Sequence, residues 1–183
     1  MSAQFDYIIV GAGSAGCVLA NRLTENGKYS VLVIEAGCSD NRFWVKTPIG
    51  YGKTFYDPAV NWMYMTEADP GINNQCSYWP RGKIIGGSSS INAMVYIRGQ
   101  AADFDGWRDL GNPGWGWQDV LPYFKKSETN SEGGTDYRGD SGPLYVNNVS
   151  AEYHPLCHTF IDAAKQYGFN YNPDFNGESQ EGV

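Results

Sequence analysis

The chain has 183 residues, 42% hydrophobic and 15% aromatic, which is enough for one sizeable core or for one domain with part of a second. Its net charge of −7 argues against nucleic acid as a partner, because phosphate backbones are bound by clustered lysine and arginine. Four scattered cysteines without a C-x-x-C pair argue against a zinc site or a disulfide framework. Without a signal-like segment or a bilayer-length apolar stretch, we expect a cytoplasmic location, with peripheral membrane association as the alternative.

The first predicted element is a strand that leads into a glycine-rich turn. Residues 7–10 are apolar and run directly into G-x-G-x-x-G at residues 11–16, and a second apolar run follows at residues 31–34. In a dinucleotide-binding βαβ unit, Gly11 makes the tight turn and Gly13 leaves the backbone open to a pyrophosphate. Gly16 lets the following helix pack closely on the strand. The pattern therefore predicts such a unit over residues 1–37.

The helix of this unit and the acid after its second strand complete the pattern. The predicted helix carries apolar residues at helical spacing, namely Ala15, Val18, Leu19 and Leu23. We expect it to end near Gly27, to direct its first N–H groups at phosphates, and to bury Cys17 as a small packing residue. Glu35 is predicted to accept hydrogen bonds from an adenosine ribose and to repel a 2′-phosphate, which disfavours NADP.

Residues 38–79 are rich in aromatic residues and are interrupted by glycine and proline. They show no helical period, which predicts an excursion that covers the bound nucleotide. Within it, residues 61–66 are expected to form an extended strand.

A second glycine motif follows at residues 79–99. Gly86 and Gly87 are predicted to form a second stretch of bare backbone, and Ser88 to Ser90 to cap a short helix. Taken alone, the motif is equally typical of an ordinary glycine turn capped by serine. A second stretch of bare backbone would suit a ligand in which further groups besides one pyrophosphate have to be bound.

The remaining elements belong to the last third of the chain. Residues 117–124 predict a short amphipathic helix, and residues 142–146 predict a strand that enters a new layer. A further helix is expected from Pro155 to a stop at Gly168, with a buried face formed by Leu156, Phe160, Ile161 and Ala164. His154 and His158 lie at its start without an accompanying acid, so we expect exposed histidines and no metal site.

Together, the two motifs resemble the glucose-methanol-choline family of FAD-dependent oxidoreductases, and within it the bacterial choline-dehydrogenase-like and alcohol dehydrogenases. The resemblance rests on D-Y-I-I-V-G-A-G-S-A-G at residues 6–16 and R-G-K-x-x-G-G-S-S-x-x-N at residues 81–92. Residues 61–64, 114–117 and 174–177 extend it over the chain. It implies cofactor contacts at Gly11, Gly13, Ser14, Ala15, Gly16, Glu35, Ala36, Trp62, Arg81, Gly82, Gly86, Gly87, Ser88, Asn92, Ala93, Met94 and Val95.

The resemblance also implies an activity. Such enzymes oxidise a primary alcohol, choline-like, aliphatic or aromatic, to the aldehyde by hydride transfer to FAD, and oxygen or a quinone-like carrier then accepts the electrons. Some members attach FAD through a histidine where this chain has Ile91, so non-covalent FAD is implied. The family's catalytic histidine lies in a region beyond residue 183. We therefore assign no catalytic residue here and expect a missing carboxy-terminal part.

The expected fold class is α/β, a Rossmann-like FAD-binding domain with a mainly parallel sheet over residues 1–142. Residues 143–183 are expected to begin an α+β substrate-binding domain. Two alternatives remain open. The chain is by itself a non-catalytic or truncated dinucleotide-binding module, whose open sheet edge would favour self-association, or it is an NAD-dependent dehydrogenase, which would leave residues 86–92 unexplained.

Overall fold

The computed structural model describes residues 3–183 and divides into two compact units. The amino-terminal unit ends at Val95, and the carboxy-terminal unit runs from Tyr96 to Val183. The expected domain boundary at residue 142 falls within the second of these units, where β5 (Glu128–Asn130) and β6 (Leu144–Val146) pair as parallel strands on either side of it. A substrate-binding domain that begins near residue 143 stays a prediction.

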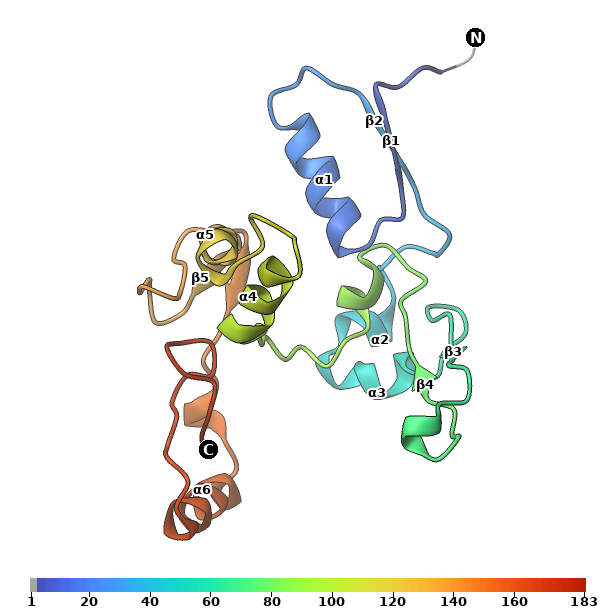
Figure 1. The fold of residues 1–183 in the computed structure, drawn as a ribbon. Helices are drawn as coiled ribbons and strands as arrows, with labels where there is room; N and C mark the ends of the chain where they lie inside the picture. The colour runs from blue at the N-terminus through green and yellow to red at the C-terminus, as the bar shows by residue number, and fades with distance from the viewer. Residues whose placement is uncertain (1–2) are drawn as a thin grey trace. The chain divides into compact units, whose positions relative to one another are not determined.

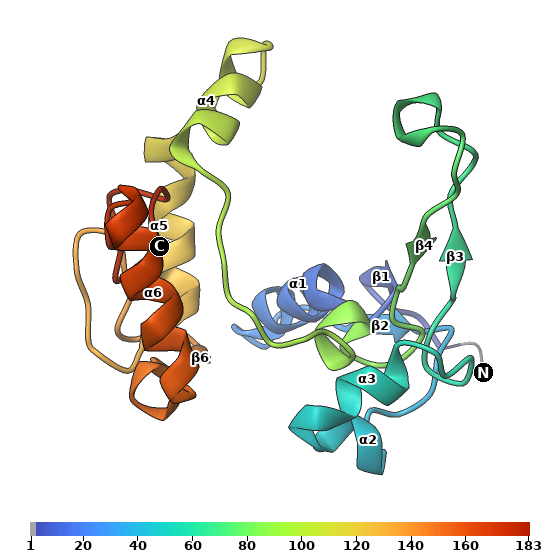
Figure 2. The same ribbon diagram turned by 90° about the horizontal axis from the view of Figure 1, so that it is seen from below.

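The amino-terminal unit begins with the predicted βαβ arrangement. β1 (Tyr7–Val10) and β2 (Val31–Ile34) are parallel and pair residue by residue, and α1 (Ser14–Thr24) connects them. Parallel strands need such a crossover, and Figures 1 and 2 show α1 lying alongside both strands. Gly27 has φ +66 shortly after the helix, as predicted for its stop. Cys17, however, is exposed, because the helix turns Gly16 rather than Cys17 toward the strands.

A side-chain contact links the residues that precede these two strands. The carboxylate of Asp6 accepts hydrogen bonds from the backbone N–H of Ser30 at 2.7 Å and from its hydroxyl at 2.8 Å. The backbone N–H and then the hydroxyl of Ser30 lower the pKa of the Asp6 carboxyl below its usual value. The bonds tie together the residues that immediately precede β1 and β2.

Residues 38–95 contain short elements. Two one-turn helices, α2 (Phe43–Lys46) and α3 (Tyr51–Thr54), are followed by an antiparallel pair, β3 (Tyr64–Met65) and β4 (Tyr78–Trp79), visible in Figure 2. The sequence shows no helical period here, because a single helical turn is too short to produce a periodic pattern. The extended strand expected at residues 61–66 is confirmed only for Tyr64–Met65, and Asn61 forms an isolated bridge with Gly82.

The core of the amino-terminal unit lies beside the end of β2 rather than on the sheet. Val60, Ile84 and Ile91 are almost completely buried, and Cys38 and Val45 pack against them. Cys38 follows β2 and forms a parallel bridge with Ile84. The second glycine motif is therefore anchored next to the first βαβ unit by burial of its own apolar residues.

The carboxy-terminal unit is mainly helical. α4 (Ala101–Asp109) and α5 (Trp117–Ser127) pack together through the buried ring of Phe104, which contacts Trp107, Trp117 and Phe124. α5 was predicted and α4 was not. The start of α4 is stabilised by Asp103, whose carboxylate accepts the N–H of Gln100 at 2.8 Å.

The last helix, α6 (Pro155–Tyr167), has the predicted bounds. Gly168 ends it with φ +109, and the imidazole Nδ1 of His154 accepts the N–H of Leu156 at 3.2 Å. Both histidines are exposed, as expected. The predicted buried face was wrong for Leu156 and Phe160, which are 68% and 69% exposed, because no element of the carboxy-terminal unit covers this side of the helix. Ile161 and Ala164 are only half-buried.

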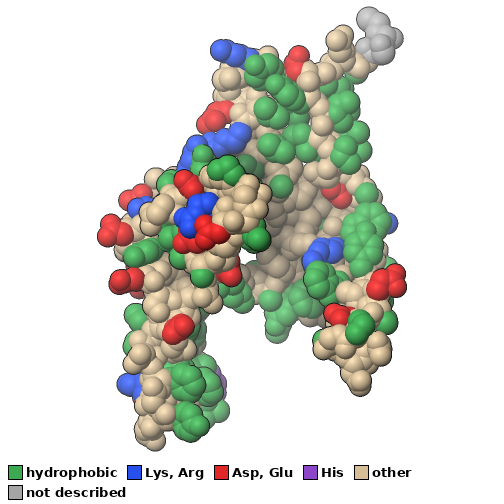
Figure 3. All heavy atoms as spheres, viewed as in Figure 1, with side chains coloured by type: hydrophobic (Ala, Val, Ile, Leu, Met, Phe, Trp, Pro, Cys, Tyr) green, Lys and Arg blue, Asp and Glu red, His purple; other side chains and the backbone are tan. Residues whose placement is uncertain are grey.

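Apolar side chains also lie uncovered on the amino-terminal unit. Figure 3 shows them over α1 and the β1–β2 pair, where Ile8 is 62% and Val10 is 85% exposed. Parallel sheets are normally covered on both faces, so this pair has the character of an interior sheet without its cover. Among residues 3–183, no helix has the length and apolar character needed to cross a bilayer.

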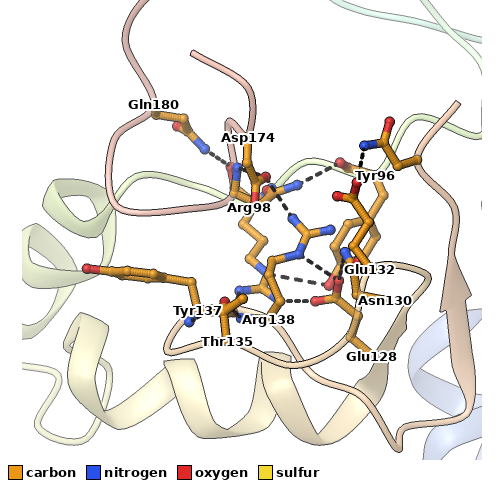
Figure 4. Close-up of polar contacts among 12 residues, drawn as sticks. Tyr96, Arg98, Glu128, Asn130, Glu132, Thr135, Tyr137, Arg138, Asp174 and Gln180 are labelled. Carbon is orange, nitrogen blue, oxygen red and sulfur yellow. Dashed lines mark hydrogen bonds and ion pairs between the residues drawn. The ribbon is translucent and has the colours of Figure 1, made fainter. Parts of the chain in front are cut away.

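A buried network of charges organises the carboxy-terminal unit, as Figure 4 shows. Arg98 and Glu128 form an ion pair whose side chains are 1% and 0% exposed. The Nε atom of Arg138 lies 2.8 Å from the second carboxylate oxygen of Glu128, and Arg138 also contacts Asp174 at 3.1 Å. One carboxylate therefore neutralises two guanidinium groups that the fold removes from water.

The same network holds the segment after α6. The backbone N–H of Arg98 donates to Asn176 Oδ1 at 2.7 Å, and the amide of Asn176 donates to the carbonyl of Tyr96 at 3.0 Å. The amide of Gln180 donates to the carbonyl of Arg98 at 2.7 Å. Residues 174–180 are thus fixed against residues 96–98 by polar contacts rather than by apolar packing.

We predict that Glu128→Ala destabilises the protein by about 3–5 kcal/mol, because it leaves buried guanidinium groups without their shared carboxylate. Asp162→Ala is the matched control. It removes an exposed carboxylate 3.9 Å from Lys165 and should change stability by at most about 0.5 kcal/mol. Urea unfolding followed by tryptophan fluorescence measures both. A loss below about 1 kcal/mol for Glu128→Ala, the range of an exposed pair, would contradict the role given to the network.

Candidate functional site

The turn after β1 and the first turn of α1 each contain a glycine that the chain itself requires. Gly11 has φ +97, a backbone conformation that favours glycine. A β-carbon on Gly16 would lie 2.0 Å from the carbonyl oxygen of Gly11 and 3.3 Å from the side chain of Ile9. The predicted roles of Gly11 in the turn and of Gly16 in close packing are therefore confirmed.

Gly13 differs from both. Its φ is −74, and a β-carbon there would have only the Cα of Gly87 within 4 Å, at 3.9 Å. Neither backbone conformation nor packing within the chain requires a glycine at this position. The bare backbone at Gly13 is thus available to a group from outside the chain.

The start of α1 adds electrostatic attraction to this bare surface. Gly13 is the N-cap, and no side chain forms a capping hydrogen bond there. The first N–H groups of a helix have no partner within the helix, and its dipole makes this end positive. Ser14 and Ala15 are exposed beside these groups. This helix start is suited to a phosphate group.

Glu35 lies against the glycine turn. One carboxylate oxygen accepts the N–H of Ala12 at 2.7 Å, and the other accepts the N–H of Gly37 at 2.8 Å. A carboxylate has about four acceptor positions, so both oxygens keep one for a further donor. Ala36 lies beside it and is exposed. The arrangement suits recognition of a ribose hydroxyl.

The second glycine motif meets the first one directly. Gly87 has φ +57, and a β-carbon on it would lie 2.8 Å from the Cα of Gly13. The N–H of Gly86 donates to the carbonyl of Ala12 at 2.7 Å, and the hydroxyls of Ser14 and Ser89 are hydrogen-bonded. The structure therefore brings together two bare stretches that are separated by about seventy residues, as a shared dinucleotide surface requires.

The serines of this motif do not cap the short 3-10 helix at Gly87–Ser90, so that expectation was wrong. Ser88 accepts the N–H of Gly82 at 3.1 Å, and the hydroxyl of Ser90 donates to the carbonyl of Ile85 at 2.7 Å. These serine hydroxyls bind other segments of the same motif because the chain folds back on itself within eight residues.

Trp62 and Arg81 are brought together by their backbones. The N–H of Trp62 donates to the carbonyl of Arg81 at 2.8 Å. Asn61, which the sequence analysis did not assign to the site, is 2% exposed and accepts the N–H of Arg81 at 2.9 Å. No sequence pattern indicates this role, because the backbone that Asn61 contacts lies 20 residues further along the chain. Lys83 lies 4.6 Å from the centre of the Trp62 ring, which places a positive charge on this side.

The last predicted group, Asn92 to Val95, lies after the buried Ile91. Its four side chains are exposed, Met94 has φ +60, and the N–H of Met94 bonds to Asn92 Oδ1 at 2.9 Å. Asn92 and Met94 line a small hollow with Trp44 from α2. The structure therefore places these residues next to the second glycine motif, while their contact with a cofactor stays a prediction.

These features define a dinucleotide-binding α/β unit. Two glycine stretches offer bare backbone, a helix start offers free N–H groups, and a carboxylate is held at the end of the second strand. A dinucleotide fits them, because Gly13, a glycine of the first motif that neither packing nor backbone conformation requires, faces Gly87 where both motifs meet. Among residues 3–183, no three His, Cys, Asp or Glu side chains are grouped to hold a metal ion.

The chain belongs to the GMC oxidoreductase family, whose model matches residues 5–183. It is 48% identical over 179 residues to the oxygen-dependent choline dehydrogenase of Rhizobium rhizogenes, a match that covers 98% of this chain and 32% of that protein. The protein of the same description from Vibrio vulnificus is 45% identical over 185 residues, which covers 100% of this chain and 33% of the relative. The chain thus spans about a third of the length of these relatives.

Solved structures agree with this family. Pyridoxine 4-oxidase from Mesorbium loti matches 94% of this chain and 34% of its own, with a TM-score of 0.86 and 37% identity. An FAD-dependent oxidoreductase from Chaetomium thermophilum matches 98% of this chain and 32% of its own, with a TM-score of 0.81 and 33% identity. The predicted α/β fold class and FAD as the cofactor of the family are therefore confirmed.

We predict that Gly87→Ala weakens FAD binding at least about ten-fold, the equivalent of one lost hydrogen bond to a charged group. The added methyl group would push Gly13 away and open the shared surface. Gly27→Ala is the matched control, because Gly27 also has a positive φ but has no atom near its β-carbon position. It should cost about 1–2 kcal/mol of stability without changing the affinity. Flavin fluorescence titration of the apoprotein tests this, and equal affinities for both variants would refute it.

Proposed function

We propose that this chain is the FAD-binding amino-terminal part of an enzyme that oxidises a primary alcohol to its aldehyde by hydride transfer to the flavin. The observation that carries the proposal is the direct approach of Gly13 and Gly87, which forms one bare surface from two motifs. Membership of the GMC oxidoreductase family supports the oxidoreductase class. The names of the relatives support a choline-like alcohol as the first substrate to test.

The residues of this chain would act by binding and orientation. The start of α1 and Gly13 would receive the pyrophosphate, and Glu35 the ribose of the adenosine. The segments at Gly86–Ser88 and Asn92–Val95 would surround the flavin, with backbone N–H groups stabilising negative charge on the reduced ring. Bound FAD supplies the hydride-accepting chemistry. The group that takes the hydroxyl proton is proposed to lie outside residues 1–183.

A second candidate function follows from the uncovered sheet. Ile8 and Val10 are largely exposed, and the chain spans about a third of its relatives. By itself it would then be a dinucleotide-binding module without turnover, prone to self-association through apolar surface. In that case oxygen or a quinone-like acceptor would have no reduced flavin to reoxidise.

The visible spectrum and a turnover assay separate these candidates. We expect the purified gene product that carries this chain to show a flavin absorption band, and choline or another primary alcohol to bleach it without oxygen. The amount of aldehyde formed should equal the amount of flavin that is reduced. A flavin band that no primary alcohol bleaches would support the module without turnover, and a protein that binds NAD but no flavin would overturn the proposal.

We also predict that acid denaturation releases the flavin intact. Ile91 stands where a linking histidine would be needed, and its side chain is buried against Val60 and Ile84 with 3% exposure. A hydrocarbon side chain can form no bond to the isoalloxazine ring. The measurement is the flavin absorption of the supernatant after acid precipitation, and yellow colour that stays on the precipitate would show a covalent link elsewhere.

A further inference from the structure

We infer that Gly37 is a positioning residue for the adenosine half of the cofactor and that it acts through the carboxylate of Glu35. The inference rests on the proposed function, because it takes the ribose of FAD to be the ligand of Glu35. Gly37 itself lies one residue beyond Ala36 and would act without touching the cofactor. Two observations carry the inference, one on the steric surroundings of Gly37 and one on its N–H group.

Gly37 has to be glycine because of the space around it. A β-carbon on Gly37 would lie 1.9 Å from the carbonyl oxygen of Lys83, 2.0 Å from its carbonyl carbon and 2.2 Å from the nitrogen of Ile84. All three are backbone atoms, which cannot turn aside as the end of a side chain can. Any other residue at position 37 would separate the end of β2 from the second glycine motif.

The segment that Gly37 contacts is fixed on its other side. Ile84 has no exposed surface, and it forms a bridge with Cys38. The N–H of Ile85 donates to the carbonyl of Cys38 at 3.0 Å, one residue before Gly86. The strain from a side chain at position 37 would therefore move residues 36 and 37, because Cys38 and residues 83–85 are held by the core.

The N–H of Gly37 connects this contact to the cofactor site. It donates to one oxygen of Glu35 at 2.8 Å, while the N–H of Ala12 donates to the other at 2.7 Å. The two amides, from opposite sides, set the plane of the carboxylate and so aim its remaining acceptor positions. If residue 37 moves, the carboxylate keeps only the bond from Ala12 and loses its fixed orientation.

The experiment compares FAD with an FAD analogue whose adenosine lacks the 2′-hydroxyl. For the apoprotein of the gene product that carries this chain, removal of that hydroxyl should weaken binding about ten-fold or more, as expected for a hydrogen bond to a charged group. In Gly37→Ala, both ligands should bind more weakly, and the ratio of their dissociation constants should fall to within about two-fold of one. Glu35→Gln should also bring the ratio of the two dissociation constants closer to one.

Two control variants distinguish positioning from general damage. In Gly82→Ala the new β-carbon would lie 2.2 Å from the backbone of Gly87, a similar clash that does not touch Glu35. This variant should weaken both ligands alike and keep the ratio of the unchanged protein. Gly52→Ala, with no atom within 4 Å of its β-carbon position, should change neither the affinities nor the ratio.

The outcomes separate this inference from the proposed function. A ratio near one in the unchanged protein would overturn the ribose contact of Glu35, and with it both proposals for this carboxylate. A high ratio that persists in Gly37→Ala would overturn the role of Gly37 alone. A ratio that collapses in Gly82→Ala as well would show general loosening of the site and would also refute the inference.

A second measurement does not depend on the folding of Gly37→Ala. In Glu35→Ala, the amides of Gly37 and Ala12 lose their acceptor, so their hydrogen exchange should accelerate at least about ten-fold. The amide of Ile85, which bonds to Cys38, should keep its protection. Unchanged exchange at Gly37 would show that its N–H does not hold the carboxylate.

Discussion

The site depends on the close contact of bare backbones. Gly13 approaches Gly87, and Gly37 approaches Lys83, at distances that leave no room for a side chain on Gly87 or on Gly37. Ala12 of the first glycine motif donates its N–H to Glu35, and its carbonyl accepts the N–H of Gly86 in the second motif. The contacts between glycine backbones and the bond from Gly86 to Ala12 depend on the course of the main chain, and the bond from Ala12 adds the carboxylate of Glu35 to them.

The two units of the chain use different physical means to fix their loops. In the amino-terminal unit, burial of Ile84 and Ile91 holds the second glycine motif, and the polar groups of the site remain open to a ligand. In the carboxy-terminal unit, the carboxylate of Glu128 compensates the charges of Arg98 and Arg138 in a buried network. Such a network stabilises a unique arrangement through the pairing of its charges, although Arg138 Nε forms no hydrogen bond within it.

The sequence predicted those parts of the site whose reason is local. Gly11 and Gly16 could be assigned their roles because a tight turn and a close helix contact arise within six residues. The roles of Gly37 and Asn61 could not be recognised, because the backbones they meet lie about twenty to fifty residues further along the chain. The exposure of Leu156 and Phe160 could not be predicted from the sequence either, since helical spacing identifies an apolar face but not what covers it.

The uncovered sheet and the nucleotide surface place separate demands on the amino-terminal unit. Ile8 and Val10 expose their side chains on β1, whereas Gly13 and Gly87 meet beyond the end of that strand, next to a core with almost no exposure. Apolar surface that lacks a cover lowers solubility and the stability of the strands, but it does not alter contacts that the core of Val60 and Ile84 holds in place. Affinity for the dinucleotide and resistance to association should therefore respond to different substitutions, the first to those that add volume between the two glycine motifs and the second to those that add polarity to the strand faces.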